Sequence, residues 1–166
     1  MEKSSDQEIG KAFSAPVDVQ LPTPGVGYYS YQGGPVPLED SQYGTQNTIN
    51  AVIAIGTRWN QPPHPAGRIG VGDISLRGGG PMPGHTTGHR LGLNVDMRPM
   101  RTDLFELPTN INDTANYNRD YTRELLQEIH AQGNIRRIYF NDSVLIGEGL
   151  CQQLAGHDDH LHVEFL

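Results

Sequence analysis

The segment GHDDHLHVEF, residues 156–165, ends in an alternation of polar and apolar residues that predicts a β-strand. Val163 and Phe165 alternate with polar neighbours, and side chains two residues apart on a strand project from the same face. His160 and His162 are therefore expected to lie side by side on one face of a sheet. Because imidazole binds metals and transfers protons near neutral pH, this strand is predicted to carry chemistry.

A second stretch rich in histidine, GHTTGHRLGLNVD, occupies residues 84–96. A glycine-rich loop precedes it and delivers His85 and His89. The odd-numbered residues of Leu91–Met97 are all apolar, which predicts a strand with those residues facing the core. Asp96 is then expected on the opposite face, where it can meet the histidines.

Together the two stretches meet the requirements of a catalytic zinc site. Such a site needs three protein ligands and an open position for water. Three residues fit this need: the loop histidine His89, the strand aspartate Asp96, and His162 from a neighbouring strand. His160 and His157 remain for proton transfer and for stabilising charge on an attacked carbonyl.

The rest of the chain predicts an α+β fold with a small, mostly antiparallel sheet flanked by helices. A helix is expected over Thr48–Trp59, capped by Thr45 or Thr48, and a longer one over Asp113–Ala131, capped by Asp113. Further elements are expected at Arg68–Leu76 (strand), Ile135–Phe140 (strand), Val144–Ile146 (short element) and Leu161–Phe165 (strand).

The length of 166 residues suits one domain, and composition divides it into two parts. Residues 1–45 are rich in Gly and Pro and are expected to form an extended arm, partly ordered on the body, with its tyrosines packed there. Residues 46–166 form the body that carries the metal site. The lone Cys151 excludes an intrachain disulfide and a Cys-rich zinc site.

Charge and hydropathy exclude two classes of partner. The formal net charge is −7 and no cluster of Lys and Arg occurs, which argues against nucleic acid. No window approaches the eighteen or so apolar residues that a membrane span needs. The polar start of the chain also lacks an apolar signal region.

The spacing His89-x6-Asp96, followed by His160-x-His162, resembles that of the LAS group of zinc peptidases. Within this group, four motifs look like those of the penicillin-insensitive murein endopeptidases. They are GDIS at 72–75, RGGGPM at 77–82, GLNVD at 92–96 and GHDDHLHV at 156–163. The resemblance runs from about residue 71 to residue 163.

This resemblance implies a small α+β domain of the LAS or D-Ala-D-Ala-peptidase type and one zinc ion per chain. It also implies hydrolysis of D-alanyl-meso-diaminopimelyl cross-links between peptidoglycan stem peptides. By position, residues 46–166 are then a zinc peptidase domain with ligands His89, Asp96 and His162. His160 would be the general base that assists the attacking water.

His157 and His85 resemble further active-site histidines of that family, which orient substrate or polarise its carbonyl. One departure concerns the first motif: the family usually has a histidine three residues before the first ligand and a serine directly before it. Here His85 lies four residues before His89, and Gly88 takes the place of the serine.

Other functions remain open at this point. The same site could serve a D,D-carboxypeptidase, an L-Ala-D-Glu peptidase or a non-catalytic, zinc-dependent cell-wall binding module; a binding module has no need of a base such as His160. A non-haem iron oxygenase would use His157-x-Asp159, but it leaves His89 and Asp96 without a role.

Two further side chains are candidates for supporting roles. Arg77, in the glycine-rich loop, could hold a substrate carboxylate, and Asp159 could orient a histidine through its ring N–H.

The predicted place of action is the periplasm or cell wall. Without a recognisable signal peptide, the chain is expected to be exported by another route, to be phage-encoded, or to have lost a leader. If it is an antibacterial effector, a delivery or immunity protein is an expected partner.

Overall fold

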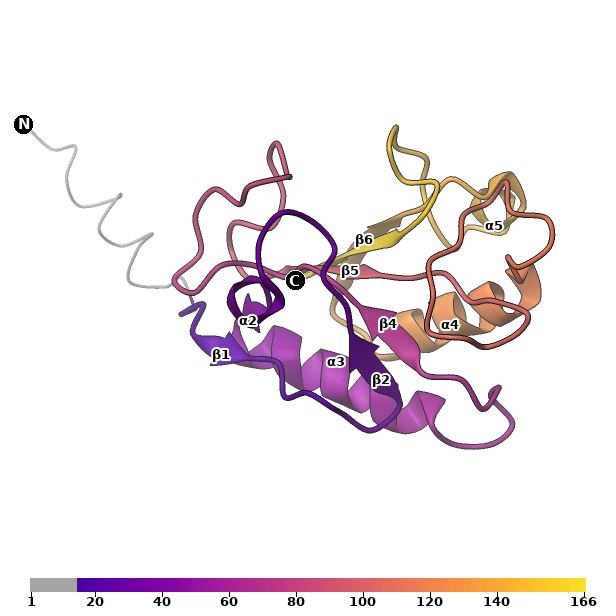
Figure 1. Ribbon diagram of the computed structural model, residues 1–166, viewed down its shortest axis with the longest axis horizontal. Coiled ribbons are helices and arrows are strands. Elements are labelled where there is room, and N and C mark those ends of the chain that lie inside the picture. Colours follow the sequence, from indigo (N-terminus) through magenta and orange to yellow (C-terminus); the bar gives the residue numbers. More distant parts are fainter. Residues whose placement is uncertain (1–14) are drawn as a thin grey trace, which may run out of the picture.

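The computed structural model describes residues 15–166 as an α+β domain (Figure 1), which confirms the predicted class. A large sheet has the strand order β2-β4-β5-β7-β6, and a separate pair joins β1 to β3. The strands are β1 (Val19–Gln20), β2 (Tyr28–Ser30), β3 (Tyr43–Gly44), β4 (Ile69–Val71), β5 (Asn94–Met97), β6 (Ile135–Tyr139) and β7 (Leu161–Phe165). The helices are α2 (Leu38–Ser41), α3 (Gln46–Trp59), α4 (Arg119–Ala131) and α5 (Ser143–Gly147).

The large sheet is mixed. Strands β4, β5, β7 and β6 pair antiparallel in turn, whereas the edge strand β2 runs parallel to β4. Strand β2 comes from the segment 1–45 that the sequence suggests is an arm; residues 1–14 of it lie outside the described residues. Tyr28 and Tyr29 of this strand are buried, in keeping with the expected packing of the tyrosines.

Helix α3 agrees closely with the sequence. Its N-cap is Thr45, whose hydroxyl accepts a hydrogen bond from the backbone N–H of Thr48 at 3.2 Å. This bond satisfies one of the N–H groups that the first turn of a helix leaves free. Ile49, Val52 and Ile55 form the buried stripe that faces the sheet.

The predicted start of helix α4 is wrong. The helix begins at Arg119, and its N-cap is Asn118, whose side chain accepts from the N–H of Tyr121 at 2.8 Å. Asp113 instead closes a turn in the preceding loop, where its carboxylate accepts from the backbone and side-chain N–H groups of Asn116. Aspartate caps turns and helices by the same bond, so its presence alone does not fix a helix start.

Two predicted strands are shorter than expected. Of Arg68–Leu76 only Ile69–Val71 is extended in the sheet, and of Leu91–Met97 only Asn94–Met97. Leu91 is 64% exposed and does not face the core. Gly92 has a φ of +68°, a left-handed conformation that breaks the strand geometry, so the alternation has structural meaning only after this glycine.

The C-terminal elements follow the sequence more closely. Strand β7 has the predicted bounds, Leu161–Phe165, and β6 ends one residue before the predicted Phe140. The short element predicted at Val144–Ile146 is helix α5, with Asp142 as its N-cap.

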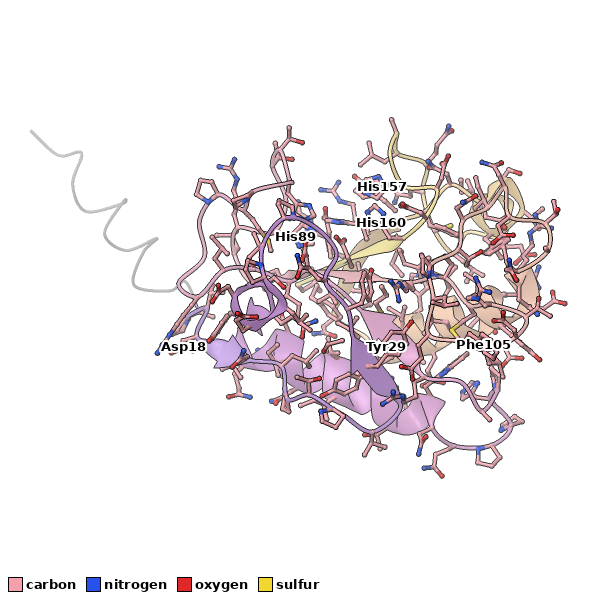
Figure 2. The ribbon with its side chains drawn as sticks, in the orientation of Figure 1. Asp18, Tyr29, His89, Phe105, His157 and His160 are labelled. Atoms are coloured by element: carbon pink, nitrogen blue, oxygen red, sulfur yellow. The ribbon has the colours of Figure 1, made fainter. Side chains whose placement is uncertain are left out.

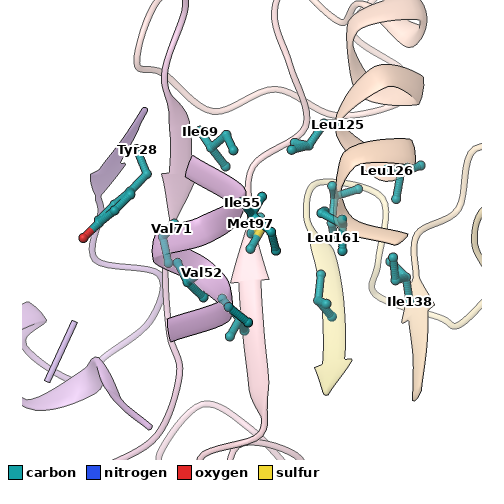
Figure 3. Close-up of a cluster of buried hydrophobic side chains, with 14 of the residues drawn as sticks. Tyr28, Val52, Ile55, Ile69, Val71, Met97, Leu125, Leu126, Ile138 and Leu161 are labelled. Atoms are coloured by element: carbon teal, nitrogen blue, oxygen red, sulfur yellow. The ribbon is translucent and has the colours of Figure 1, made fainter. Parts of the chain in front are cut away.

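The core fills the space between the helices and one face of the large sheet. Helices α3 and α4 lie against this face (Figure 1). In Figure 3, buried side chains from both helices meet those of β2, β4, β5, β6 and β7. Examples are Val52 and Ile55 of α3, Leu125 of α4, Met97 of β5 and Leu161 of β7. Burial of each such side chain stabilises the fold by about 1.5–3 kcal/mol. The opposite face of the sheet is left free for polar groups.

Across residues 15–166, no helix combines the length and the apolar character that a membrane crossing needs.

Candidate metal centre

The floor of the candidate site is the polar face of three neighbouring strands. The sheet register sets Asp96 of β5 opposite His162 of β7, and His162 opposite Tyr139 of β6. Because side chains alternate along a strand, these three residues form one row across the face that the helices leave free. A cleft of about 890 Å³ opens over this row.

Loops form the walls of the cleft. Residues 31–35 and 84–89 line one side, and residues 154–157 line the other. Figure 2 shows His89 beneath the first wall, with His157 and His160 on the C-terminal segment facing it. Histidines from both halves of the sequence motif are thus brought to one cleft.

The carboxylate of Asp96 lies at the centre of this cluster. Its Oδ1 is 3.1 Å from Nδ1 of His162, 3.3 Å from Nε2 of His89 and 3.9 Å from Nε2 of His160. Its Oδ2 is 4.0 Å from Nε2 of His85. Asp96 is only 6% exposed, so these imidazoles are its main surroundings.

The backbone and second ring nitrogen of His89 fix its orientation. His89 has a φ of +64°, a left-handed conformation that is uncommon for a residue with a side chain. Its Nδ1–H donates to the carbonyl of Ile74 at 2.7 Å. In the neutral imidazole the lone pair is then on Nε2, and among the described residues this buried atom makes no hydrogen bond. A ring held by a backbone carbonyl with a free Nε2 is a typical arrangement of a metal-ligating histidine.

Glycine at position 88 allows the approach of this loop to β7. A Cβ at Gly88 would lie 3.2 Å from Cε1 of His162, which is tighter than most real contacts of a Cβ. This close approach is consistent with glycine at position 88, rather than the serine of the peptidases that the sequence resembles.

The other ring nitrogen of His162 also has polar neighbours. Nε2 lies 2.9 Å from the side-chain nitrogen of Asn94 and 3.6 Å from a carboxylate oxygen of Glu164. Asn94, Asp96, His162 and Glu164 all belong to the same polar face, so both nitrogens of His162 are held by strand residues.

Asp96 is ionised in spite of its burial. Burial by itself would raise the pKa of this carboxyl, but the imidazoles of His162 and His89 beside it hold its pKa well below the usual range. A buried carboxylate that stays charged is suited to bind a cation.

Two groups of side chains here could hold a metal ion. One is His85, His89 and Asp96, and the other is His157, His160 and His162; within each group the ligand atoms lie within 4.8 Å of one another. The 3.1 Å contact of Asp96 with His162 joins the two groups. The predicted ligands thus come from both groups, and imidazole with carboxylate suits a divalent transition metal.

His160 and His157 lie at the edge of the cluster. Nδ1 of His160 is 2.7 Å from a carboxylate oxygen of Asp159, which is the orienting contact considered in the sequence. Nδ1 of His157 lies 3.1 Å from the carbonyl of Ala155. Burial, together with the nearby His160, lowers the pKa of His157, so its imidazole is neutral near pH 7.

His85 is paired with an acid that sequence reasoning did not single out. Its Nε2–H donates to Oδ2 of Asp73 at 2.8 Å, and this bond raises the pKa of His85 above its ordinary value. Asp73 is 1% exposed, and its other oxygen has no hydrogen-bond partner among the described residues. A Cβ at Gly34 would lie 3.1 Å from Oδ2, so the loop needs glycine to pass over this carboxylate.

Further cleft residues also escaped the sequence analysis. Arg137 and Tyr139 could have been found by extending the alternation of β6, and Glu164 by extending that of β7. Tyr31 carries no local signal; burial, and then the charge of Asp96, raise the pKa of its phenol. Arg77 is exposed and does not line the cleft.

No protein-family model matches this chain, and no curated protein matches it. The chemistry of the site therefore has to be inferred from its own side chains.

Asp96→Ala and His162→Ala are each expected to abolish binding of a divalent metal, because each removes one of the three predicted ligands. The measurement is metal content per chain after dialysis. At a metal concentration of one hundred times Kd, the wild-type free energy of unfolding should rise by about 2.7 kcal/mol and that of the variants should not. The control His130→Ala, at the exposed end of α4, should bind as the wild type does. Full metal content in either site variant would contradict the assignment.

Asp73→Asn is expected to lower the pKa of His85, because the neutral amide no longer favours the charged imidazole while burial continues to oppose it. NMR titration of the histidine ring protons in the metal-free protein measures this shift. Asp159→Asn, which changes a neighbour of His160 instead, is the matched control. An unchanged His85 pKa in Asp73→Asn would show that the pairing has no electrostatic effect.

Proposed function

We propose that this chain is a zinc-dependent peptidoglycan endopeptidase that hydrolyses D-alanyl-meso-diaminopimelyl cross-links. The observation that carries the proposal is the convergence of Nε2 of His89, Oδ1 of Asp96 and Nδ1 of His162 on the floor of an open cleft. The buried Nε2 of His89 supports a cation at this point, because it lies 3.3 Å from a carboxylate oxygen of Asp96 and makes no hydrogen bond in the described part of the chain.

His89, Asp96 and His162 would hold the zinc ion. When bound in such a site, zinc acidifies a water molecule toward neutral pH and polarises a carbonyl oxygen. One carboxylate and two imidazoles match the three-ligand sets of catalytic zinc sites.

His160 is the proposed general base. Its Nδ1 is held by Asp159 at 2.7 Å, which leaves Nε2 to face the cluster, 3.9 Å from Asp96. An imidazole oriented in this way can take a proton from the attacking water and return it to the leaving amine. The exposure of Asp159 keeps this pair in contact with solvent, where the proton can exchange.

His85 and His157 are proposed to act on the substrate carbonyl and on its position. The contact with Asp73 favours a protonated His85, which has a second N–H left to stabilise negative charge on the carbonyl oxygen. His157 is neutral and lies across the cleft, so it can position the peptide through a hydrogen bond without adding charge.

The cleft also suits a peptide. It is open along the polar face of the sheet and is bordered by loops on both sides, so an extended stem peptide can lie across it.

We further propose that the fold is of the LAS type and that the protein acts in the periplasm or cell wall, where peptidoglycan is found.

Incubation with purified sacculi, followed by separation of the released muropeptides, tests this function. The expected result is loss of D-alanyl-meso-diaminopimelyl cross-linked dimers and a matching gain of monomers. Shortening of pentapeptides with dimers retained would indicate a D,D-carboxypeptidase, and disaccharides that keep only L-alanine would indicate an L-Ala-D-Glu peptidase. Intact dimers with zinc bound would overturn the endopeptidase assignment.

His160→Ala is expected to keep the zinc ion but to lose activity by about 10²- to 10⁴-fold, because it removes the proton acceptor and none of the ligands. Zinc content and the rate of dimer cleavage are measured on the same sample. His130→Ala, which removes an imidazole far from the cleft, should keep both. A His160→Ala protein with wild-type activity would refute the role of this residue as base.

A further inference from the structure

Two arginines line the cleft, and they differ in their partners. Nε of Arg137 donates to a carboxylate oxygen of Glu164 at 2.6 Å, so its charge is balanced within the sheet. Arg98 has no carboxylate within ion-pair distance among the residues that the structure describes. Its guanidinium is therefore a positive charge in the cleft without an acidic partner in the described chain.

The position of Arg98 follows from the strand that carries Asp96. Arg98 lies two residues after Asp96, and its backbone N–H donates to the carbonyl of Gly70, which continues the sheet pairing. Alternation then projects its side chain from the same face as Asp96, toward the cleft. The guanidinium thus lies on the floor of the cleft, next to the proposed zinc ligands along β5.

Aromatic and backbone groups hold the guanidinium in place. It lies 4.0 Å from the ring centroid of Tyr31, and Nη1 donates to the hydroxyl of Tyr29 at 3.2 Å and to the carbonyl of Glu106 at 3.3 Å. Stacking on an aromatic face and two neutral acceptors orient the planar group without neutralising it. Nε and Nη2 donate to no acceptor in the described residues, so one edge of the fork is available to a ligand.

We propose that Arg98 is a specificity residue that binds a free carboxylate of the substrate beside the scissile bond. This inference rests on the proposed function, because it concerns the peptide bound in the same cleft. The fork of an arginine binds a carboxylate through two parallel hydrogen bonds, which a lysine cannot reproduce.

The other charged groups of the cleft favour Arg98 as the binding position of a substrate carboxylate. Asp96, Asp159 and Glu164 line the same cleft and would repel a substrate carboxylate bound near them. The guanidinium of Arg137 is already paired with Glu164. With the zinc site and His85 taken up by the scissile carbonyl, Arg98 is the cleft cation left for a second anionic group of the substrate.

The proposed cross-link supplies such a group. The amine that leaves on hydrolysis belongs to the D-centre of diaminopimelate, and that carbon also carries a free carboxylate. The C-terminal D-alanine offers a second carboxylate. Both share the chemistry that Arg98 would recognise, and amidation of one or the other separates them.

Binding is measured by calorimetry on the full chain, zinc-loaded and carrying His160→Ala so that the ligand is not cut. The probes are a cross-linked muropeptide dimer with free carboxylates, the same dimer amidated at the D-centre of diaminopimelate, and the dimer amidated at the C-terminal D-alanine. With Arg98 present, amidation of one carboxylate should weaken binding by about ten- to a hundredfold, as expected for a charge-assisted hydrogen-bonded pair. With Arg98→Gln added, the three dimers should bind with affinities within about twofold of one another.

Arg98→Lys and Arg137→Gln complete the design. Arg98→Lys keeps the charge and loses the fork, so its discrimination should be intermediate. Arg137→Gln changes the other guanidinium of the cleft and should leave the discrimination as it is. Equal discrimination with and without Arg98, loss of it in Arg137→Gln alone, or no binding of any dimer would each overturn the inference. If the dimers bind with discrimination that depends on Arg98 but the wild-type protein does not cut them, the inference stands and the endopeptidase assignment fails.

Discussion

The contact between Asp96 and His162 is the interaction on which the rest of the site depends. The two residues face each other across β5 and β7, and their 3.1 Å contact lies within the sheet pairing itself. A shift of either strand by one residue would turn its own member of the pair into the core. The neighbouring cross-strand pair, Val95 and Val163, is buried in the core and opposes such a shift. The same hydrophobic packing that stabilises the fold therefore sets the position of the polar cluster.

Much of the fold follows from local signals in the sequence. Alternation gave the bounds of Leu161–Phe165, and a capping threonine with an apolar stripe located the helix that ends at Trp59. The start of α4 did not follow, because Asp113 and Asn118 offer the same capping bond. In the structure the backbone N–H of Asn118 donates to the carbonyl of Met100, a tertiary contact that local sequence does not show. The parallel pairing of β2 with β4 was also beyond reach, since short strands distant in sequence carry no local record of their partner.

The candidate site divides in the same way. His89, Asp96 and His162 could be grouped from the sequence because motif spacing and strand alternation place them on adjacent elements, and the structure brings them together. Asp73 and Arg98 could not be assigned in advance. Asp73 meets His85 only through the packing of a loop, and the stacking of Arg98 on a tyrosine of another segment is a long-range contact. The local sequence pattern identifies the site residues on strands, whereas tertiary packing decides which loop residues lie beside them.

The division of the cleft into a floor of strands and walls of loops has a consequence for how such a protein can change over generations. The floor is fixed by sheet pairing and by the core beneath it, so substitutions there disturb the fold and the proposed metal site together. The walls, at residues 31–35, 84–89 and 154–157, are loops, most of whose residues are partly or fully exposed. Apart from His89, these loops can take insertions and exchanges that alter which ligand the cleft accepts, while Asp96 and His162 on the strands stay in place. An architecture of this kind lets the ligand preference of the cleft drift among descendants without disturbing the polar cluster on the sheet.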